Sequence, residues 1–559
     1  MQWKLTHRHN HECIENKGGK TLSYDPNLGI QIIEQDGFAF KDLDNNGRLD
    51  PYEDWRLPLT QRIQDFTSRF VLWQEGDCLY YRKGRIELSR EFCDWMKNCD
   101  CRTTILQASD LLQEDEEYLR ENYILAMLLL MFDNDFDMGK EDYLLQLIVQ
   151  SMDLGVLENI IYSIMEALEA EDPLAHKQAN YLWKNAIFPI YNHTETTYFP
   201  VGEEKFKAMV EELKKAESFI FMEYFIIAPG VMWDTILDIL IDKVKQGVEV
   251  RVMYDDAGCI TTLPQDYYLT LRRLGIQAKV FNPIKPRLAM QMNNRDHRKI
   301  LVIDGKVGMT GGINLADEYI NQKERFGHWK DCSVMIRGEA VWNLTLMFLQ
   351  FWNYDEKEKD DVFSYKPDFK VFENIHNDGY VQPYSDSPTD EENVGEYTHI
   401  NMINSANRYV YATTPYLVID NEMKTALLLA AKNGIDVRIL VPHIPDKWYV
   451  FAVTRSNYKD LIEGGVKIYE YTPGFVHGKS FVVDDKMAIV GTVNMDYRSY
   501  YLHYECGVWF YRSKVVMDVK RDYLETLSKS HQVTLEECRQ VRLSIRIMRA
   551  ILNLFSPMM

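Results

Sequence analysis

A histidine, a lysine and an asparagine occur with the same spacing at two places in the chain. The pattern is His-x-Lys, four residues, Asp, six residues and Gly-x-x-Asn. Its members are His297, Lys299, Asp304, Gly311 and Asn314 in the first copy, and His477, Lys479, Asp484, Gly491 and Asn494 in the second. This set suits a phosphodiester: one imidazole can attack phosphorus, the other can protonate the leaving alkoxide, and lysine and asparagine can hold the charged oxygens. The chemistry needs no metal or other cofactor.

An apolar run follows each lysine, ILVI in the first copy and FVVD in the second, and predicts a buried strand. Residues two apart share one face of a strand, so each His and Lys can aim at one point. An alternative interpretation is that the histidines and lysines only cap strands in two homologous lobes. Recurrence of the whole pattern argues against it.

The wider sequence resembles the phospholipase D superfamily and, within it, the bacterial cardiolipin synthases. The resemblance extends from about Ile187 to the C-terminus and rests on FIFMEYFI, YDDAG, FNP, NNRDHRK, GGINLADEYI, HWKD, TTPYL and GTVNMDYRS. It implies a phosphatidyltransferase that makes cardiolipin from two phosphatidylglycerol molecules, with release of glycerol, through a phosphatidyl-histidine intermediate. A phospholipase D-type hydrolase and other phosphatidyl transfers stay open as alternatives. A superfamily nuclease is disfavoured by the acidic composition, and a non-catalytic scaffold by the intact motifs.

Two carboxylates complete the predicted site. Asp331 in WKDCSVMI and Glu505 in HYECGVWF occupy matching places after the two motifs, each followed by a cysteine. We expect each to hydrogen-bond the far nitrogen of an imidazole, which fixes the tautomer and supports the cation that forms. The resemblance implies this role, and it implies a structural role for Asp304 and Asp484 at the lobe interface. It also implies that the first-motif histidine is the nucleophile and the second the general acid.

The fold class follows from an internal repeat. AESFIFMEYFII pairs with ANRYVYATTPYL, KQGVEVRV with KNGIDVRI, and GIQAKVFNP with GVKIYEYTP. Each copy indicates strand, amphipathic helix, strand, helix, strand and catalytic strand. We therefore expect an α/β fold of two homologous phospholipase D-like lobes, residues 186–370 and 371–530, around a pseudo-two-fold active site.

The first copy carries ten additional residues before its histidine, because His297 lies fourteen residues after Pro283 whereas His477 lies four after Pro473. The side chains of this insert are apolar and basic, which suits a lipid with an anionic headgroup. A loop that packs the lobes together is the alternative.

The first third of the chain lies outside the resemblance. Within residues 1–59, KDLDNNGRLDPYE fits an EF-hand-like calcium loop with the ligands Asp42, Asp44, Asn46, Arg48 through its carbonyl, Asp50 and Glu53. An empty Asx-rich turn is the alternative, because the preceding residues make a poor entering helix. Residues 41–63 also resemble the opening segment of family 3 β-glucosidases, but no glycosidase sequence follows. Residues 60–185 are expected to form a mostly helical accessory domain.

The composition of the chain limits the partners and the cellular location that we expect. The net charge of −21 disfavours non-specific binding to nucleic acid. The longest apolar run, residues 123–132, is about half of what a membrane-spanning helix requires, so none is expected. The nine cysteines show no paired C-x-x-C spacing, which favours reduced thiols in a cytosolic compartment.

The C-terminal segment, residues 531–559, is predicted to be basic and amphipathic. As a helix it would gather Arg539, Arg542, Arg546 and Arg549 on one face. A strand over residues 541–547 and a helix that packs on a lobe are the alternatives. We expect peripheral attachment to the cytoplasmic side of the cell membrane, with anionic phospholipid as the partner.

Overall fold

The structure is a computed structural model of the 559-residue chain. It describes residues 3–8, 11–17, 21–24, 31–42, 47–51, 54, 56–57, 72–75, 78–81, 84–87, 155–284, 293–354, 356, 359–372, 374–376, 378–389, 392–553 and 556. The chain divides into two compact units, Met1–Ser163 and Ile164–Met559.

The described part of the first unit is built mainly of antiparallel strands. They form a sheet β1-β2-β3, a hairpin β4-β5 and a sheet β6-β7-β8. Their bounds are β1 Trp3–Arg8, β2 His11–Asn16, β3 Thr21–Tyr24, β4 Gln31–Gln35, β5 Phe38–Asp42, β6 Leu72–Glu75, β7 Cys78–Tyr81 and β8 Gly84–Glu87. Ile14 and Ala39 are buried against Trp3 and Ile32 in a small core.

The prediction of a mostly helical domain over residues 60–185 is wrong for residues 72–87. This stretch is rich in aromatic residues and is broken by the polar, glycine-containing pairs EG and KG, which is the composition of a meander of short strands. Helices occur only towards the end of the range, at α6 (Gly155–Glu171) and α7 (Pro173–Ala186), among the residues that the structure describes.

Helix α7 belongs to the second unit. Asp172 caps it by accepting hydrogen bonds from the backbone N–H groups of Leu174 and Ala175, and a proline occupies its first position. Because α7 packs against strand β18 (Tyr380–Asp386) and helix α13 (Val394–Ser405), the second unit starts at Ile164 and not at the predicted boundary of residue 186.

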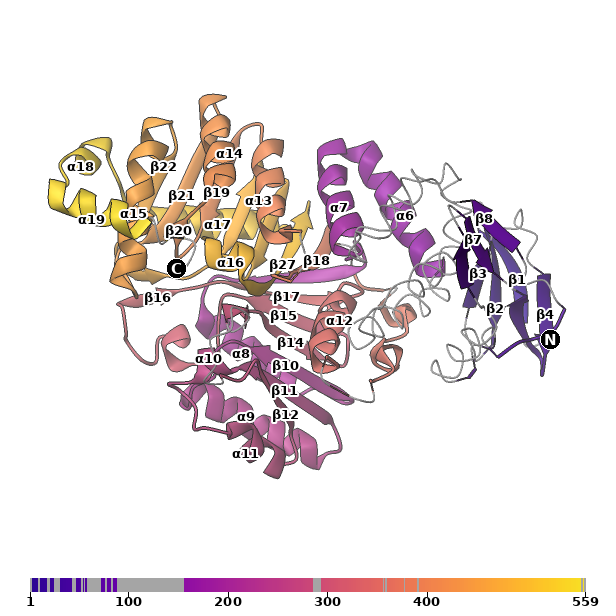
Figure 1. The fold of residues 1–559 in the computed structure, drawn as a ribbon. Coiled ribbons are helices and arrows are strands. Elements are labelled where there is room, and N and C mark those ends of the chain that lie inside the picture. The colour runs from indigo at the N-terminus through magenta and orange to yellow at the C-terminus, as the bar shows by residue number, and fades with distance from the viewer. Residues whose placement is uncertain are drawn as a thin grey trace. The chain divides into compact units, whose positions relative to one another are not determined.

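Lobe 1 is a mixed sheet with helices on its faces (Figure 1). The strand order is β12-β11-β10-β14-β15-β17-β9, with β10, β11 and β12 parallel and the remaining pairs antiparallel. The strands are β9 Thr194–Phe199, β10 Phe219–Tyr224, β11 Glu249–Asp255, β12 Gln277–Phe281, β14 Lys299–Ile303, β15 Val307–Gly311 and β17 Ser333–Gly338. The helices are α8 Gly202–Leu213, α9 Val231–Lys245, α10 Asp256–Cys259, α11 Tyr267–Arg273, the 3-10 helix η3 Asp317–Ile320 and α12 Val341–Trp352.

Lobe 2 repeats this plan, as the sequence repeat predicts. The order β22-β21-β19-β24-β25-β27-β18 matches that of lobe 1, and β28 pairs with the β22 edge. The connector holds η4 (Val362–Tyr365) and η5 (Phe369–Phe372). The strands are β18, β19 Tyr409–Thr413, β21 Asp436–Pro442, β22 Lys467–Tyr471, β24 Ser480–Val483, β25 Met487–Gly491, β27 His503–Tyr511 and β28 Ser530–Gln532. The helices are α13, α14 Asn421–Lys432, α15 Trp448–Glu463, α16 Tyr497–Tyr501 and α17 Lys514–Ser528.

Short strands from each lobe pair with the other lobe. β13 (Arg295–Asp296) runs parallel to the start of β27, and β16 (His328–Lys330) runs parallel to β23 (Gly474–Val476). Both pairs join the residues just before one motif histidine to the residues just before the opposite carboxylate. A further pair, β20 (Leu417–Val418) with β26 (Met495–Asp496), lies within lobe 2. The lobes are therefore related by a pseudo-two-fold arrangement centred on the motifs.

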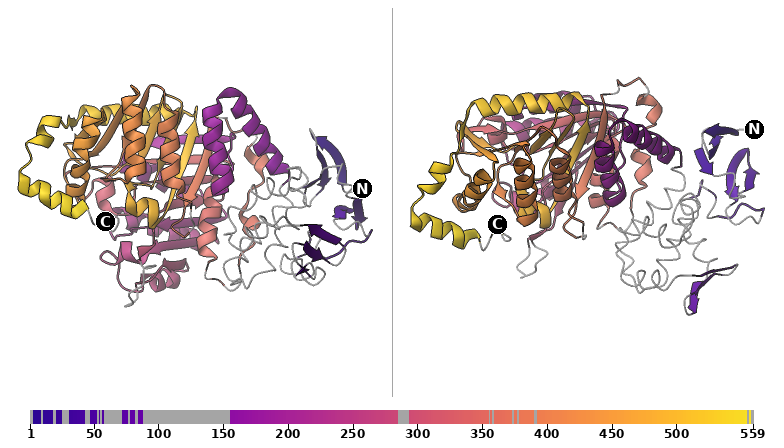
Figure 2. Two further views of the ribbon diagram at one scale, coloured as in Figure 1. Left: turned by 45° about the horizontal axis from the view of Figure 1, so that its top comes forward. Right: turned by 90° about the horizontal axis from the view of Figure 1, so that it is seen from above.

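Two helices lie in the described part of the C-terminal segment, and the second covers residues 543–553, so the strand alternative for residues 541–547 is wrong. Helix α18 (Leu535–Arg539) begins with a capping box between Thr534 and Glu537. Helix α19 (Leu543–Asn553) packs against α15, and the two further views show it beside the helices of lobe 2 (Figure 2). Within the part of the chain that the structure describes, no helix is both long and apolar enough to cross a bilayer.

Candidate active site

Strands β14 and β24 position the His-x-Lys pairs at matching ends of the two sheets. Lys299 opens β14 opposite Tyr224, and Ser480, next to Lys479, opens β24 opposite Thr413. The backbone of each histidine is held by the other lobe: His297 N–H donates to the carbonyl of Tyr504 (2.9 Å), and His477 N–H to that of Lys330 (2.6 Å). Both histidines are 7% exposed. The backbone of each motif histidine is therefore fixed by a strand of the other lobe.

The predicted hydrogen bonds between imidazoles and carboxylates are present, and they cross between the lobes. His297 Nδ1 lies 2.9 and 3.0 Å from the two carboxylate oxygens of Glu505, and His477 Nδ1 lies 2.7 Å from Oδ2 of Asp331. Gly312 leaves room for Asp331, because a Cβ there would lie 2.1 Å from Asp331 Oδ1. The spacing of the sequence identified these carboxylates, but not which imidazole each one contacts.

Burial and charge set the protonation of these pairs. Burial acts to raise the pKa values of the Glu505 and Asp331 carboxyls, but their histidine partners outweigh it and hold both pKa values below the usual range. The carboxylates are thus ionised and accept from Nδ1–H, which leaves Nε2 of each imidazole available to a substrate. Burial lowers the pKa of His297 well below its usual value, and burial together with Lys479 lowers that of His477 to about 4.

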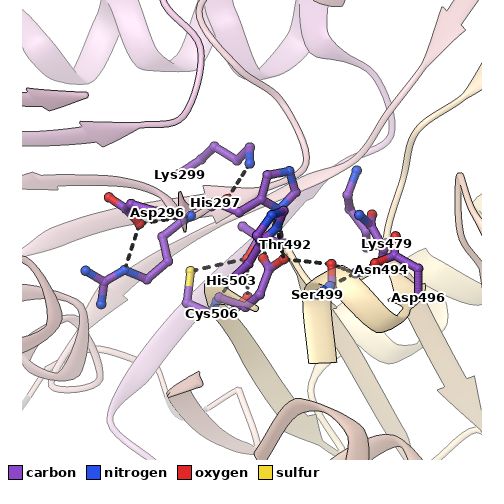
Figure 3. A network of polar contacts seen from close by, with 12 residues as sticks. Asp296, His297, Lys299, Lys479, Thr492, Asn494, Asp496, Ser499, His503 and Cys506 are labelled. Atoms are coloured by element: carbon purple, nitrogen blue, oxygen red, sulfur yellow. Dashed lines mark hydrogen bonds and ion pairs between the residues drawn. The ribbon is translucent and has the colours of Figure 1, made fainter. Parts of the chain in front are cut away.

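The motif lysines converge on the same place. The ammonium of Lys299 donates to the carbonyl of His297, and that of Lys479 donates to the carbonyl of His477 (2.5 Å) and lies 3.0 Å from its ring nitrogens. Burial lowers the pKa of Lys299 to about 7, and the charge of Lys479 contributes to this shift. The charge of Lys299 in turn helps to lower the pKa of His477. Figure 3 shows His297 and Lys299 of one lobe with Lys479 and Asn494 of the other.

The two motif asparagines are buried but differ in their contacts. Asn314 Oδ1 accepts from the backbone N–H of Ile226 (3.0 Å), and its Nδ2 donates to the hydroxyl of Tyr319 (2.8 Å). Asn494 N–H donates to Ser499 Oγ, and Ser499 in turn donates to Glu505 (2.7 Å). Ser499 therefore steadies the carboxylate that holds His297, a role that the sequence did not reveal.

Asp304 and Asp484 lie outside this group, and the prediction that they brace the lobe interface is wrong. They follow the far ends of β14 and β24, roughly 16 Å along a strand from the motif lysines. Each carboxylate accepts three backbone N–H groups of its own lobe at 2.6 to 2.9 Å: Asp304 those of Glu217, Ser218 and Phe219, and Asp484 those of Asn407, Arg408 and Tyr409. They tie the turn after the catalytic strand to the start of β10 or β19.

Replacing Asp304 or Asp484 with alanine is therefore expected to lower stability and to spare the chemistry. The loss of three charge-assisted hydrogen bonds should cost about 2 to 4 kcal/mol of unfolding free energy. Thermal melts measure the loss, and Asp242→Ala, which removes an exposed carboxylate paired only with Lys245, is the matched control. An unchanged melting temperature with abolished turnover would return these residues to the active site.

The surroundings of the two histidines differ. Beside His297 lies a buried ionic network, in which Arg298 Nε contacts Glu223 (2.6 Å) and Asp296 (3.3 Å), and Asp296 N–H donates to Asp255 (3.0 Å). At the matching places of lobe 2 stand uncharged residues, including Gly478, Thr413, Val476 and Pro442.

The ring of His477 packs among aromatic side chains. They are Tyr319, Trp329 and Phe475, with ring centroids 5.4 to 5.7 Å away. The repeat keeps the reacting groups and the carboxylates that hold them, but not the other side chains packed around each histidine.

Two predicted features lie partly or wholly outside the described residues. The central part of the insert before His297, residues 285–292, is one. Asp44, Asn46 and Glu53 of the predicted calcium loop also lie outside the described residues. Asp42 Oδ2 accepts a hydrogen bond from the backbone N–H of Gly47 (2.8 Å). The element before the loop is strand β5 and not an entering helix. Calcium binding by Asp42, Arg48, Asp50 and their neighbours stays a prediction.

Two homologous α/β lobes that each bring a His-x-Lys pair to a shared site define the phospholipase D-like class. The solved phosphatidylserine synthase of Haemophilus influenzae has the same fold, with a TM-score of 0.51 at 14% identity over 65% of this chain and 95% of that one. Residues 209–327 and 399–527 match the family described as "Cardiolipin synthase, PLD-like domain".

Two proteins of similar sequence support the same assignment. A "Cardiolipin synthase" of a Geobacillus species is 40% identical over 374 residues, which are 66% of this chain and 74% of the relative. An "Uncharacterized protein" of Streptococcus mutans is 49% identical over 403 residues, 72% of this chain and 86% of the relative. The chain belongs to the cardiolipin synthase family.

Proposed function

We propose that this protein is a cardiolipin synthase that transfers the phosphatidyl group of one phosphatidylglycerol to the glycerol hydroxyl of a second. The observation that carries the proposal is the shared buried site, in which both His-Lys pairs meet and each imidazole is held by a carboxylate of the other lobe. Side chains of the chain itself supply the whole reaction, so it needs no cofactor.

In the first step His297 is the nucleophile. Its Nδ1–H is held by both oxygens of Glu505, so the lone pair of Nε2 is fixed toward the substrate phosphorus. The P–N bond forms as the bond from phosphorus to the glycerol oxygen breaks, and His477 gives that oxygen a proton. Lys299 and Lys479, with the asparagine amides, offset the charge that develops on the non-bridging oxygens.

His477 must carry a proton to act as the acid, although its pKa in the substrate-free site is about 4. A phosphodiester anion bound between the two lysines adds a negative charge next to the imidazole. An adjacent negative charge raises the pKa of a histidine, and here it also cancels part of the effect of Lys479. Substrate binding thus prepares the acid that the reaction requires.

In the second step a hydroxyl of the second phosphatidylglycerol attacks the phosphatidyl-His297 intermediate. His477, neutral after the first step, takes the proton of that hydroxyl while the P–N bond breaks. Water in the same place would give phosphatidic acid, which is the hydrolase alternative. Product analysis by mass with phosphatidylglycerol vesicles tests the proposal, since transfer yields cardiolipin with glycerol and hydrolysis yields phosphatidic acid.

The lipid must reach the end of the sheets that carries the histidines. In both lobes this end bears the loops after the first two parallel strands, because β10 and β19 finish beside Lys299 and Ser480. Large apolar side chains are exposed on these loops or at the helix starts that follow: Val231 (54%) and Ile260 (60%) in lobe 1, and Trp448 (64%) in lobe 2. Such side chains on a protein with a lipid substrate suit insertion into a bilayer surface.

Helix α19 extends this surface. Its Leu552 packs, as Tyr497 does, against a buried cluster of valines in lobe 2, and Tyr497 lies three residues after Asn494. Leu543 and Ile551 are exposed on the same helix. We propose that α19 and the loops of both lobes seat the protein on the cytoplasmic face of the cell membrane.

The four arginines of this segment do not all face solvent. Arg539 pairs with Glu463 (3.2 Å), and burial lowers the pKa of the half-buried Arg549. Arg542 and Arg546 stay exposed, and each can contribute about 1 kcal/mol of attraction to an anionic leaflet. The apolar side chains must therefore carry more of the binding than the sequence predicted.

A double variant, Trp448→Asp with Leu543→Asp, is expected to reduce co-sedimentation with phosphatidylglycerol vesicles at least about tenfold, since each change removes an apolar anchor and adds a repelled charge. Turnover of a soluble short-chain phosphatidylglycerol should change less than about twofold. Leu429→Asp, which replaces a leucine that is also more than half exposed, on α14, is the control. If the native protein, the double variant and the Leu429 variant bound vesicles equally, the membrane-binding surface of the protein would lie elsewhere.

A further inference from the structure

We propose that His297, His503 and Glu505 form a binding site for a transition-metal cation of the Zn²⁺ class, and that metal bound there switches the enzyme off. The ligand atoms of these three residues all lie within 4.8 Å of one another, and all three side chains are buried. In the described parts of the chain this is the one group of at least three histidine, cysteine or acidic side chains with such spacing. The binding part of the proposal is independent of the reaction, whereas the inhibition rests on the proposed function.

His503 is the residue that makes the site, and the reaction described above leaves it without a role. It is 8% exposed, its ring centroid lies 5.4 Å from that of His297, and its Nδ1 lies 3.7 Å from Glu505 Oε1. That distance is beyond a hydrogen bond, and Nδ1 has no hydrogen-bond partner among the described residues. A buried imidazole nitrogen thus lies beside a carboxylate at a distance too long for an ordinary hydrogen bond.

The pseudo-two-fold relation supplies an internal comparison. β13 aligns Arg295 with His503, and β23 aligns Phe475 with Trp329, so Trp329 occupies in lobe 1 the place of His503 in lobe 2. Trp329 packs on His477 as His503 packs on His297, with centroids 5.4 Å apart in both cases. Indole offers no metal ligand. The pair His477 and Asp331 therefore lacks a third donor from this position, and the site exists only on the His297 side.

Two imidazoles and one carboxylate are a ligand set of zinc proteins that keep an open fourth position. In a tetrahedral site with bonds of about 2.0 to 2.1 Å the ligand atoms lie roughly 3.4 Å apart. Glu505 Oε1 is 2.9 Å from His297 Nδ1 and 3.7 Å from His503 Nδ1, and the ligand atoms of the two imidazoles lie within 4.8 Å of each other. The two rings would therefore have to approach each other by at most about 1.4 Å to complete the geometry. Calcium and magnesium prefer oxygen ligands and do not fit this set.

Metal binding would inactivate the nucleophile through its tautomer. Coordination uses the Nδ1 lone pair of His297, so Nδ1 can no longer carry the proton that it shares in a hydrogen bond with Glu505. That proton moves to Nε2, and the imidazole stays neutral with one proton. Nε2 then has no lone pair with which to attack phosphorus. Glu505 is already ionised, and no oxidation or further reactant is involved.

The test compares the full chain with His503→Asn, and with His531→Asn as a control for an exposed histidine. Zn²⁺ is titrated calorimetrically, and turnover of short-chain phosphatidylglycerol is measured in zinc buffers relative to the metal-free rate of each protein. Because His7, His9 and His11 offer another place for zinc, the site is scored as the difference between proteins. We expect one zinc equivalent to be lost in His503→Asn and the inhibitory concentration to rise at least about tenfold, with the control unchanged.

Equal zinc stoichiometry and equal inhibition in His503→Asn would overturn the proposal. His503→Gln, checked by thermal melting, serves if the asparagine variant fails to fold. Co²⁺ gives a readout that needs no turnover, since a tetrahedral site on the native chain absorbs in the visible region and the band should vanish in the His503 variant. A lost band in a protein that makes no cardiolipin would uphold the metal site and reject the proposed function; an unaltered band would reject the site.

Discussion

His297→Asn is expected to form no covalent adduct with a phosphatidyl ester that has a good leaving group, whereas His477→Asn should accumulate one. The nucleophile is indispensable for the P–N bond, but a leaving group that departs unaided needs no acid. With phosphatidylglycerol both variants should lose at least about 10³-fold in turnover, because a glycerol alkoxide is a poor leaving group. Intact-protein mass spectrometry after rapid quenching detects the adduct, and peptide mapping locates it.

The matched control for this comparison is His399→Asn, which removes a buried histidine of lobe 2 whose Nδ1 contacts the hydroxyl of Tyr500 (3.0 Å). It should behave as the native protein in adduct formation if it folds. An adduct found on His477 in the His297 variant would reverse the two roles and leave the two-histidine mechanism standing. Adducts on neither histidine would exclude a phosphatidyl-histidine intermediate.

The second large effect is expected from the crossed carboxylates. Glu505→Gln should lower turnover by about 10⁴-fold, the size of effect known for amide replacement of a carboxylate that orients a catalytic histidine. The amide can donate a hydrogen to Nδ1, so it favours the tautomer in which Nε2 carries the proton and cannot attack. Because Glu505 contacts His297 and not His477, the motif histidine of its own lobe, this variant should fail to form the adduct, as His297→Asn does.

Asp331→Asn is the paired experiment. It should impair turnover of phosphatidylglycerol but still allow the adduct to form from an activated ester, because Asp331 contacts His477. Adding Glu505→Gln to His297→Asn should cost little more than either change alone, since the two residues act as one unit. If Asp331→Asn were the variant that blocked the adduct, the carboxylates would act within their own lobes.

Much of the site was predictable because its reacting groups are repeated in sequence. Residues that recur with the same spacing in both copies, such as Lys299 and Lys479, are recognisable without any structure. The same is true of Asp331 and Glu505, whose register is marked by the following cysteines. A strand period of two then predicts that His and Lys share a face.

Features that depend on contacts between the copies were not predictable. The pairing of β13 with β27 and of β16 with β23 decides which carboxylate meets which imidazole, and no local pattern encodes it. His503 and Trp329 stand at matching positions but share no chemistry, so a search for repeated residues passes over both. Asp304 has the right spacing to the motif, yet a strand of ordinary rise carries it to the far end of the sheet.

Outside the repeat, local sequence patterns predict secondary structure and side-chain exposure less well. The helical spacing of the neighbouring residues predicts a helical domain that includes residues 72–87, whereas this aromatic and glycine-containing stretch forms short strands that pair with each other. A helical wheel places Arg549 on one face with three other arginines, because it takes no account of what the helix packs against. In the structure α19 lies against α15, and that contact removes Arg549 from the exposed face.

The central claim is phosphatidyl transfer between two lipids through the enzyme, and one measurement tests it most directly. The purified protein is incubated in ¹⁸O-water with vesicles that mix phosphatidylglycerol bearing deuterated acyl chains with the unlabelled lipid, and the products are resolved by mass. The account predicts glycerol together with cardiolipin, part of it carrying one deuterated and one unlabelled phosphatidyl half, and no ¹⁸O in its phosphates. Phosphatidic acid carrying ¹⁸O as the only phosphorus-containing product would contradict it and identify a hydrolase.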